Sequence, residues 1–173
     1  MAMKKVMMLA ALATAVSSSA FAGSDISVGY AHSRADDIHL NGVNLKYAYT
    51  PEGENLGFIS SLTITGKEET EKQNGVKGEA DYAYGSALIG AQYRLNDYVT
   101  PYAMAGIGRG AVKVKVSGYG YHYEDTERKN GFAYSAGVKV HVTPTIFLDA
   151  SYEGTKVFDT QVNSFVVGGG VSF

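Results

Sequence analysis

The sequence predicts an all-β fold, an eight-stranded antiparallel up-and-down transmembrane β-barrel, on three observations. Eight segments alternate apolar and polar side chains with the two-residue period of a strand. The connections between these segments alternate between short turns and long polar stretches, as they do in outer-membrane barrels. The chain of 173 residues contains 21 glycines, 13 tyrosines and three prolines, and this composition favours strands and tight turns over helices.

The first 22 residues are predicted to be a signal peptide that is removed from the barrel. Two lysines at positions 4–5 precede an apolar run over residues 6–16, and residues 20–22 form an A-x-A cleavage signal. The apolar run is too short to cross a bilayer as a helix. We therefore expect cleavage between Ala22 and Gly23, which leaves one barrel domain over residues 23–173.

The composition of the mature chain excludes several classes of protein. Without the two signal-peptide lysines, the 15 basic residues become 13 against 17 acidic ones, a net charge of −4, which is unlike a nucleic-acid-binding surface. The chain has no cysteine, so its stability must come from its own core or from lipid. No mature segment has the 18 unbroken apolar residues that indicate a transmembrane helix. This criterion does not detect barrel strands, because they are apolar only at alternate positions.

The first four alternating segments lie between residues 26 and 95. Their apolar faces, in chain order, are Ile26, Val28 and Tyr30, then Val43, Leu45, Tyr47 and Tyr49, then Leu56, Phe58, Leu62 and Ile64, then Ala87, Ile89, Ala91, Tyr93 and Leu95. The opposite faces hold mainly small or polar residues. In the third segment, Ile59 and Ser60 break the alternation.

The last four segments run from about Tyr98 to the C-terminus. The fifth is the longest, and we assign Tyr102 and Met104 to its apolar face together with Val112, Val114 and Val116. The apolar faces of the other three are Phe132, Tyr134, Ala136, Val138, Val140 and Val142, then Ile146, Leu148, Ala150 and Tyr152, then Phe165, Val167, Gly169, Val171 and Phe173. The last of these segments therefore ends the chain on an aromatic residue.

The connections fall into two length classes. Residues 51–55, 96–97 and 143–145 are short turns rich in Pro, Asn, Asp and Thr, whereas residues 34–39, 66–80, 117–130 and 155–161 are longer polar segments. We interpret the second class as loops, and the one over residues 67–81 as mobile. An even number of strands with short turns at one end and long loops at the other is typical of outer-membrane barrels.

Periodicity does not say which face of the strands points inward, and a soluble barrel of the lipocalin type is the alternative. Bulky apolar side chains on all eight strands would overfill so narrow a lumen, whereas the small residues of the other face fit it. The tyrosines beside the short turns (Tyr47, Tyr49, Tyr93, Tyr98 and Tyr102) resemble an interfacial aromatic girdle. We therefore expect the apolar faces to meet lipid.

The charged residues of the polar faces are then enclosed in the barrel. Because an unpaired charge in a narrow interior is costly, we expect them to form one structural network that plugs the barrel. The predicted interior network consists of Lys46, Arg94, Arg109, Lys139, Asp149 and Glu153, with Asp81 as a further candidate.

Four stretches of strand and turn carry a resemblance to a known family: residues 42–49 (GVNLKYAY), 92–98 (QYRLNDY), 134–138 (YSAGV) and 148–153 (LDASYE). With the terminal Phe173, they resemble the Ail/OmpX/Lom family of outer-membrane proteins. The resemblance implies location in a bacterial outer membrane and strands that project beyond it. It also implies a role in host-cell attachment, invasion or resistance to complement.

The fifth segment is nearly twice the 9–11 residues that a spanning strand needs. We expect residues 112–123 to project as an exposed ribbon that recruits a partner strand by β-augmentation. Cationic and aromatic side chains are typical of contact hot spots, and those of the predicted partner-binding ribbon are Lys113, Lys115, Tyr119, Tyr121, Tyr123, Arg128 and Lys129. Outer-membrane lipid and lipopolysaccharide would surround a monomeric barrel, and matrix proteins, heparin or complement regulators are the candidate host partners.

The sequence offers no convincing catalytic, cofactor-binding or metal-binding residue. His32, His39, His122 and His141 show no Ser/Asp constellation for nucleophilic catalysis. His122 lies beside Glu124 and Asp125 but lacks a second histidine nearby. Asp149 and Glu153 are about 13 Å apart along a strand. The alternatives to a binding protein are a structural or stress-related barrel without a ligand, a lipid-modifying enzyme and, last, a pore.

Overall fold

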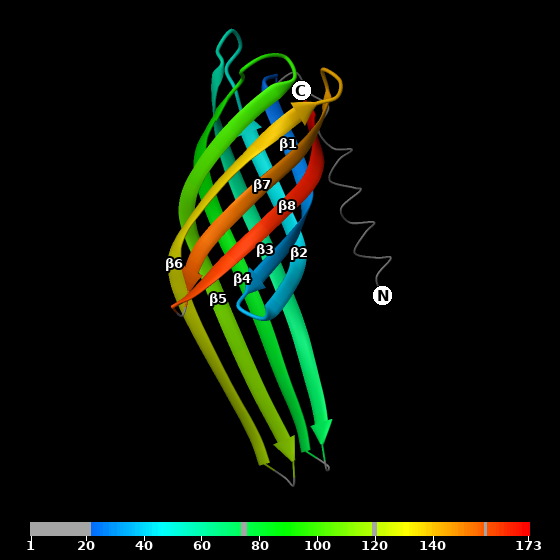
Figure 1. Ribbon diagram of the computed structural model, residues 1–173, viewed down its shortest axis with the longest axis vertical. Coiled ribbons are helices and arrows are strands. Elements are labelled where there is room, and N and C mark those ends of the chain that lie inside the picture. Colours follow the sequence, from blue (N-terminus) through cyan, green and yellow to red (C-terminus); the bar gives the residue numbers. More distant parts are fainter. Residues whose placement is uncertain (1–21, 74–75, 119–120, 158) are drawn as a thin grey trace.

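The chain forms one closed barrel of eight antiparallel strands (Figure 1). The computed structural model describes residues 22–173 except 74–75, 119–120 and 158. The strands are β1 (Ser24–Ala35), β2 (Ile38–Tyr49), β3 (Leu56–Gln73), β4 (Val76–Tyr93), β5 (Val99–Gly118), β6 (Tyr121–His141), β7 (Ile146–Val157) and β8 (Thr160–Ser172). Each strand pairs with the next, and β1 closes the barrel against β8. The predicted fold class is confirmed, and the predicted signal peptide, residues 1–22, lies almost entirely outside the described residues.

Hydrogen bonds between the chain ends complete the closure at the short-turn rim. The amide of Gly23 donates to the carbonyl of Phe173 at 2.7 Å, and the amide of Phe173 donates to the carbonyl of Ser24 at 2.9 Å. At the opposite rim, Asp36 and Asp159 have positive φ angles of 51° and 60°, a conformation that Asp tolerates in tight turns. No helix in the described part of the chain is long and apolar enough to span a bilayer.

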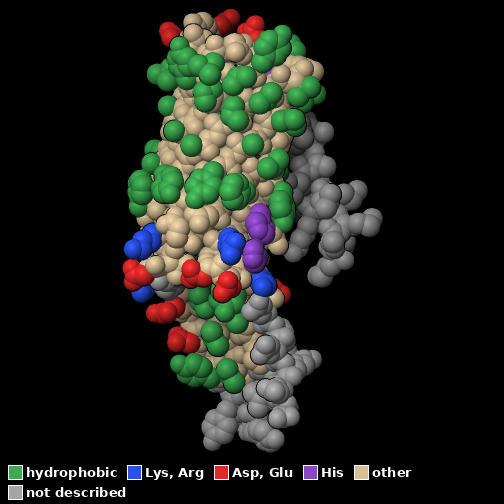
Figure 2. All heavy atoms as spheres, in the orientation of Figure 1, with side chains coloured by type: hydrophobic (Ala, Val, Ile, Leu, Met, Phe, Trp, Pro, Cys, Tyr) green, Lys and Arg blue, Asp and Glu red, His purple; other side chains and the backbone are tan. Residues whose placement is uncertain are grey.

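The outer surface of the barrel is apolar and its interior is largely polar. Leu62, Ile64, Ile89 and Phe132 are each more than half exposed, whereas Lys46, Lys139 and Glu153 are buried. Figure 2 shows green apolar side chains over the outside of the barrel, with charged side chains below them and acidic ones at the upper end. A surface of this kind is stable against acyl chains and unfavourable against water.

The four middle strands are longer than the others. β3, β4, β5 and β6 have 18, 18, 20 and 21 residues, against 12 or 13 in the remaining four, and they extend together past the barrel rim, towards the bottom of Figure 1. The segments 66–80 and 117–130, predicted to be long loops, are therefore mostly strand. The predicted loops over residues 34–39 and 155–161 are also mostly strand, because β1 continues to Ala35 and β7 to Val157. The prediction fails there because polar alternation on a solvated sheet resembles a loop composition.

Two assignments of side-chain direction are wrong. Tyr102 and Met104 of β5 are buried at 5% and 4% exposure, so they face the interior rather than lipid, and Tyr102 does not belong to the aromatic girdle. Val112, Val114 and Val116 lie on the same side of β5, so they do not belong to the lipid-facing surface either. In β3, Ile59 is fully buried while Ser60 is half-buried on the outer face. The side chains of β3 continue to alternate between the two faces at these positions. The exception is in polarity, because the apolar Ile59 points inward and the polar Ser60 points outward. Tyr47, Tyr49, Tyr93 and Tyr98 are exposed as expected.

Candidate functional site: the barrel interior and the projecting sheet

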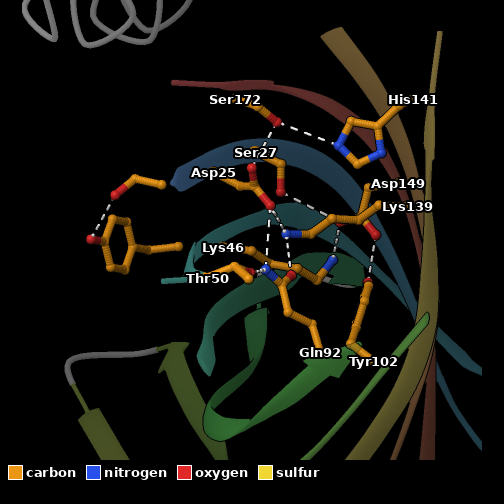
Figure 3. A network of polar contacts seen from close by, with 12 residues as sticks. Asp25, Ser27, Lys46, Thr50, Gln92, Tyr102, Lys139, His141, Asp149 and Ser172 are labelled. Carbon is orange, nitrogen blue, oxygen red and sulfur yellow. Dashed lines mark hydrogen bonds and ion pairs between the residues drawn. The ribbon is translucent and has the colours of Figure 1, made fainter. Parts of the chain in front are cut away.

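The barrel interior near the short turns is crossed by a first ionic cluster around Lys139 of β6 (Figure 3). Its ammonium group donates to Asp25 Oδ2 at 2.8 Å and to Gln92 Oε1 at 2.7 Å. Gln92 in turn donates to Thr50 Oγ1 at 2.9 Å, and the hydroxyl of Ser172 donates to Asp25 Oδ1 at 2.7 Å. The cluster therefore ties β1, β4, β6 and β8 together across the lumen.

A second ionic cluster is centred on Asp149 of β7. The ammonium group of Lys46 donates to Asp149 Oδ2 at 2.7 Å, and the hydroxyl of Tyr102 donates to Asp149 Oδ1. Lys46 is 2% exposed and Asp149 is 3% exposed. Charges so deeply buried are tolerated only when they are paired and hydrogen-bonded, and these two meet both conditions.

Glu153, one inward position further along β7 than Ser151, is held by hydroxyl groups. It accepts hydrogen bonds from Thr63 at 3.1 Å and from Tyr84 at 2.6 Å. Tyr84 also lies 2.6 Å from the hydroxyl of Thr155. Side chains from β3, β4 and β7 thus meet at this level of the barrel interior.

Two residues of the predicted interior network are placed elsewhere. Arg94 follows the last residue of β4 and is exposed at the short-turn rim. Arg109 points outward from β5, because Gly108 and Gly110 take the inward positions, and its Nε donates to Asn130 Oδ1 at 2.7 Å. Asp81 lies on β4 beside Lys113 of β5 and not in the lumen.

Asp25 is an interior charge that sequence reasoning missed. It lies one residue before the first apolar position of the alternation, so it reads as part of a polar terminus. Its position along the strand could have revealed it, because Asp25 lies on the same strand face as the small inward residues Ser27 and Gly29. The pairing with Lys139 depends on contact across the lumen between strands far apart in sequence, and periodicity does not reveal such contacts.

The parts of β3 to β6 that extend past the barrel rim form what we call the projecting sheet. The face of this sheet that continues the outer barrel surface carries a row of cations. Arg109, Lys113 and Lys115 follow one another at outward positions on β5. Arg128 of β6 lies opposite Ala111 and fills the gap in the row. We name Arg109, Lys113, Lys115 and Arg128 the cationic strip.

Acidic side chains border the cationic strip. Lys113 forms an ion pair with Glu124 of β6, and the hydrogen bond and charge of Lys113 hold the pKa of Glu124 below its ordinary value. On the other side, Asp81 and Glu79 of β4 lie opposite Lys113 and Lys115 in the register. Positive charge therefore runs along β5 and includes Arg128 of β6, with Glu124 of β6 on one side and Asp81 and Glu79 of β4 on the other.

The other face of the projecting sheet is apolar along β5. Val112, Val114 and Val116 alternate with the strip lysines, and Val114 and Val116 are about 40% exposed (39% and 41%). Lys129 and Tyr123 of β6 lie on this face, opposite Gly110 and Val116. The residues predicted to form one binding ribbon are thus divided between two faces. The side chain of Tyr121 and all of Tyr119 lie outside the described residues.

The predicted edge for β-augmentation is not on β5. That strand pairs with β4 up to Ser117 and with β6 up to Gly118, so both of its sides are occupied. Within the described pairing, β6 has one strand neighbour from Tyr121 to Phe132, and β3 has one from Lys67 to Gln73. An edge that could add a strand therefore lies on β6 or β3.

Comparison with known proteins places this barrel in a family. A family model described as an outer membrane protein β-barrel domain matches residues 6–173. The chain belongs to this outer-membrane β-barrel family. It is 35% identical to the virulence membrane protein PagC of Salmonella typhimurium, over 85% of each chain. It is 33% identical to outer membrane protein X of Escherichia coli K12, over 99% of this chain and 100% of that protein.

Attachment invasion locus proteins (Ail) are further relatives of this outer-membrane barrel. The one from Yersinia pseudotuberculosis is 35% identical, over 87% of this chain and 84% of that protein. The crystal structure of Ail from Yersinia pestis, in complex with the heparin analogue sucrose octasulfate, superposes with a TM-score of 0.78. It is 32% identical and covers 87% of this chain and 97% of the other. The resemblance to the Ail/OmpX/Lom family and the location in a bacterial outer membrane are confirmed.

Proposed function

We propose that this outer-membrane barrel is a surface protein that attaches the bacterium to host cells by binding polysulfated glycans of the heparin class on its cationic strip. The observation that carries the proposal is the alignment of Arg109, Lys113, Lys115 and Arg128 on one outward face. The relative Ail, whose crystal structure contains a heparin analogue, supports the same class of ligand. Invasion and complement resistance are further roles for a protein held at a host surface.

The dimensions of the cationic strip suit an extended polyanion. Lys115 lies six positions after Arg109, which corresponds to about 20 Å along a strand. Arg128 projects from the neighbouring strand between them, so the positive charges form a row rather than a single point. Guanidinium and ammonium groups together provide directional and flexible donors for sulfate oxygens.

Glu124 limits the affinity of the proposed site. Its ion pair with Lys113 must open before a sulfate can take the same ammonium group. Both side chains are exposed, 36% for Lys113 and 57% for Glu124, and water and salt screen exposed ion pairs so that they contribute little. A glycan that bears several sulfates can therefore displace the carboxylate.

The test is a heparin-binding measurement on the refolded protein in detergent micelles or nanodiscs. The double variant Lys113→Gln, Lys115→Gln should bind at least about tenfold more weakly at physiological salt, and Glu124→Gln should bind more tightly. Arg94→Gln removes one positive charge at the opposite end of the barrel and should bind like the unmodified protein. Equal binding by the double variant and the Arg94→Gln control would refute the proposal.

A second candidate function is a structural or stress-related barrel without a ligand, which the filled interior favours. Deletion of the gene would then raise sensitivity to detergent and leave attachment to host cells unchanged. Under the leading proposal, the deletion reduces attachment, and re-expression of the double lysine variant fails to restore it. Matrix proteins and complement regulators belong in the same binding screen, and Tyr123→Ser tests the contribution of the valine face to binding them.

A further inference from the structure

Two histidine side chains meet on the outer surface of the β1–β2 hairpin. His39 Nδ1 lies 3.3 Å from His32 Nε2, and the two rings are stacked with centroids 5.4 Å apart. His32 pairs with Asn41 across the hairpin and Arg34 pairs with His39, so the two histidines are diagonal neighbours on one face. Figure 2 shows histidine side chains gathered beside Lys or Arg at the lower border of the apolar belt.

Hydrogen bonds to the side chain of Asn41 orient the ring of His32. Its Nδ1 lies 2.7 Å from Asn41 Oδ1, and the same oxygen accepts the hydroxyl of Tyr30 at 2.6 Å. An amide oxygen only accepts, so the proton of a neutral His32 is on Nδ1 and the lone pair is on Nε2. That lone pair points towards His39, and this is the arrangement by which proteins prepare a histidine to ligate a metal.

We propose that His32 and His39 together bind one divalent transition-metal ion, with Zn²⁺ as the reference ion. Two imidazole nitrogens that ligate one Zn²⁺ tetrahedrally, each at about 2.0–2.1 Å, are about 3.3–3.4 Å apart, and the observed separation is 3.3 Å. His39 is exposed, so its ring can turn to direct the Nδ1 lone pair at the ion. Water completes the coordination.

The surroundings indicate a site of moderate affinity. Among the residues that the structure describes, no three His, Cys, Asp or Glu side chains are grouped as a metal site, so the protein supplies two ligands here. Arg34, the cross-strand partner of His39, adds a positive charge that opposes a cation. Its Nε donates to the carbonyl of Asp36 at 3.0 Å. Replacing this arginine should therefore strengthen metal binding without touching either ligand.

Calorimetric titration of Zn²⁺ into the refolded, untagged protein in detergent tests the proposal. We expect one ion per chain, at least about tenfold weaker binding for His32→Gln and for His39→Gln because each removes one arm of a chelate, and tighter binding for Arg34→Gln. His122→Gln and His141→Gln are matched controls that should bind as the unmodified protein does. The electron paramagnetic resonance spectrum of added Cu²⁺ should show two coupled imidazole nitrogens.

Two results would overturn the inference. One is Zn²⁺ binding that survives both single substitutions in the pair, or that disappears in a control. The other is a Cu²⁺ spectrum that shows only one coupled nitrogen and that does not change in the His39→Gln variant. Because both histidines lie on the outer surface, the variants are expected to fold, and the β-sheet circular dichroism of each preparation checks this. A well-folded His39→Gln protein with unaltered Zn²⁺ affinity is evidence against the site.

Discussion

The ring of Tyr102 occupies the space that a side chain on Gly137 would fill. A Cβ atom built on Gly137 would lie 2.5 Å from Cζ of Tyr102 and 2.6 Å from the carbonyl oxygen of Ala150. Tyr102 and Gly137 are direct partners in the β5–β6 register. The glycine therefore allows the tyrosine to reach across to Asp149.

Replacing Gly137 with alanine should destabilise the barrel by about 1–3 kcal/mol, the usual cost of overpacking a close-packed interior. Equilibrium unfolding in detergent with urea measures it. Gly85→Ala is the matched control, because the nearest atom to its added Cβ, Thr63 O, is 3.4 Å away. If the two alanine variants lose the same stability, the packing explanation is wrong.

Lys46→Met should lower the free energy of unfolding by about 3–5 kcal/mol, because it leaves Asp149 buried without its cation. The double variant Lys46→Met, Asp149→Asn should recover much of that loss, since no unpaired charge remains. Unfolding midpoints of the two single variants and the double variant form a mutant cycle. Strict additivity of the two losses would show that the pair is not energetically coupled.

An arginine in the middle of the apolar belt should oppose insertion. Leu45→Arg is expected to reduce the free energy of folding into lipid vesicles by about 2–4 kcal/mol. Asp37→Arg, in the exposed turn between β1 and β2, should have little effect. A stable, monomeric protein in plain buffer without any amphiphile would contradict the lipid-facing assignment of this surface.

The ion pair between Lys113 and Glu124 should depend on pH in a defined direction. The pKa of Glu124 is held below its ordinary value of 4.5 by the hydrogen bond and charge of Lys113. A lowered carboxyl pKa means that the pair is fully formed above the ordinary value and is lost as the pH falls through the lowered one. Carbon-detected NMR titration of the Glu124 carboxyl measures this pKa, and Lys113→Gln should raise it.

The proposed signal peptide predicts the mass of the mature protein. Material isolated from outer membranes should begin at Gly23, as mass spectrometry of the intact chain will show. Ala22→Asp should block processing, because the peptidase requires a small residue at that position, and the precursor should accumulate. A mature protein that retains residues 1–22 would contradict this prediction.

The barrel itself was predictable because alternation of side chains is a local property of strands. Leu45, Phe58 and Val167 each indicate the lipid-facing side of their own strand, and this assignment does not require the pairing between strands to be known. On β5 this reasoning fails, since small residues such as Ala103 and Ala105 occupy the outward positions beside a buried Tyr102. The largest side chains then indicate the wrong face.

The contacts that make the candidate sites depend on register and on distances across the lumen. Lys139 and Asp25 are far apart in sequence, yet their side chains meet at 2.8 Å. His32 and His39 meet because β1 and β2 turn tightly between Ala35 and Ile38, where the sequence suggests a longer loop. Neither the two-residue turn nor its pairing can be derived from hydrophobic periodicity alone.

The continuity of β3 to β6 from barrel to tip has a mechanical consequence. A pull on the tip is directed along the strands and loads the hydrogen bonds between neighbours in shear, so that many bonds resist together rather than opening one after another. The β4–β5 ladder, which joins the two projecting hairpins, runs without interruption from Lys77↔Ser117 down to Gln92↔Tyr102. A bacterium held in flowing liquid by this sheet would transmit drag directly into its envelope.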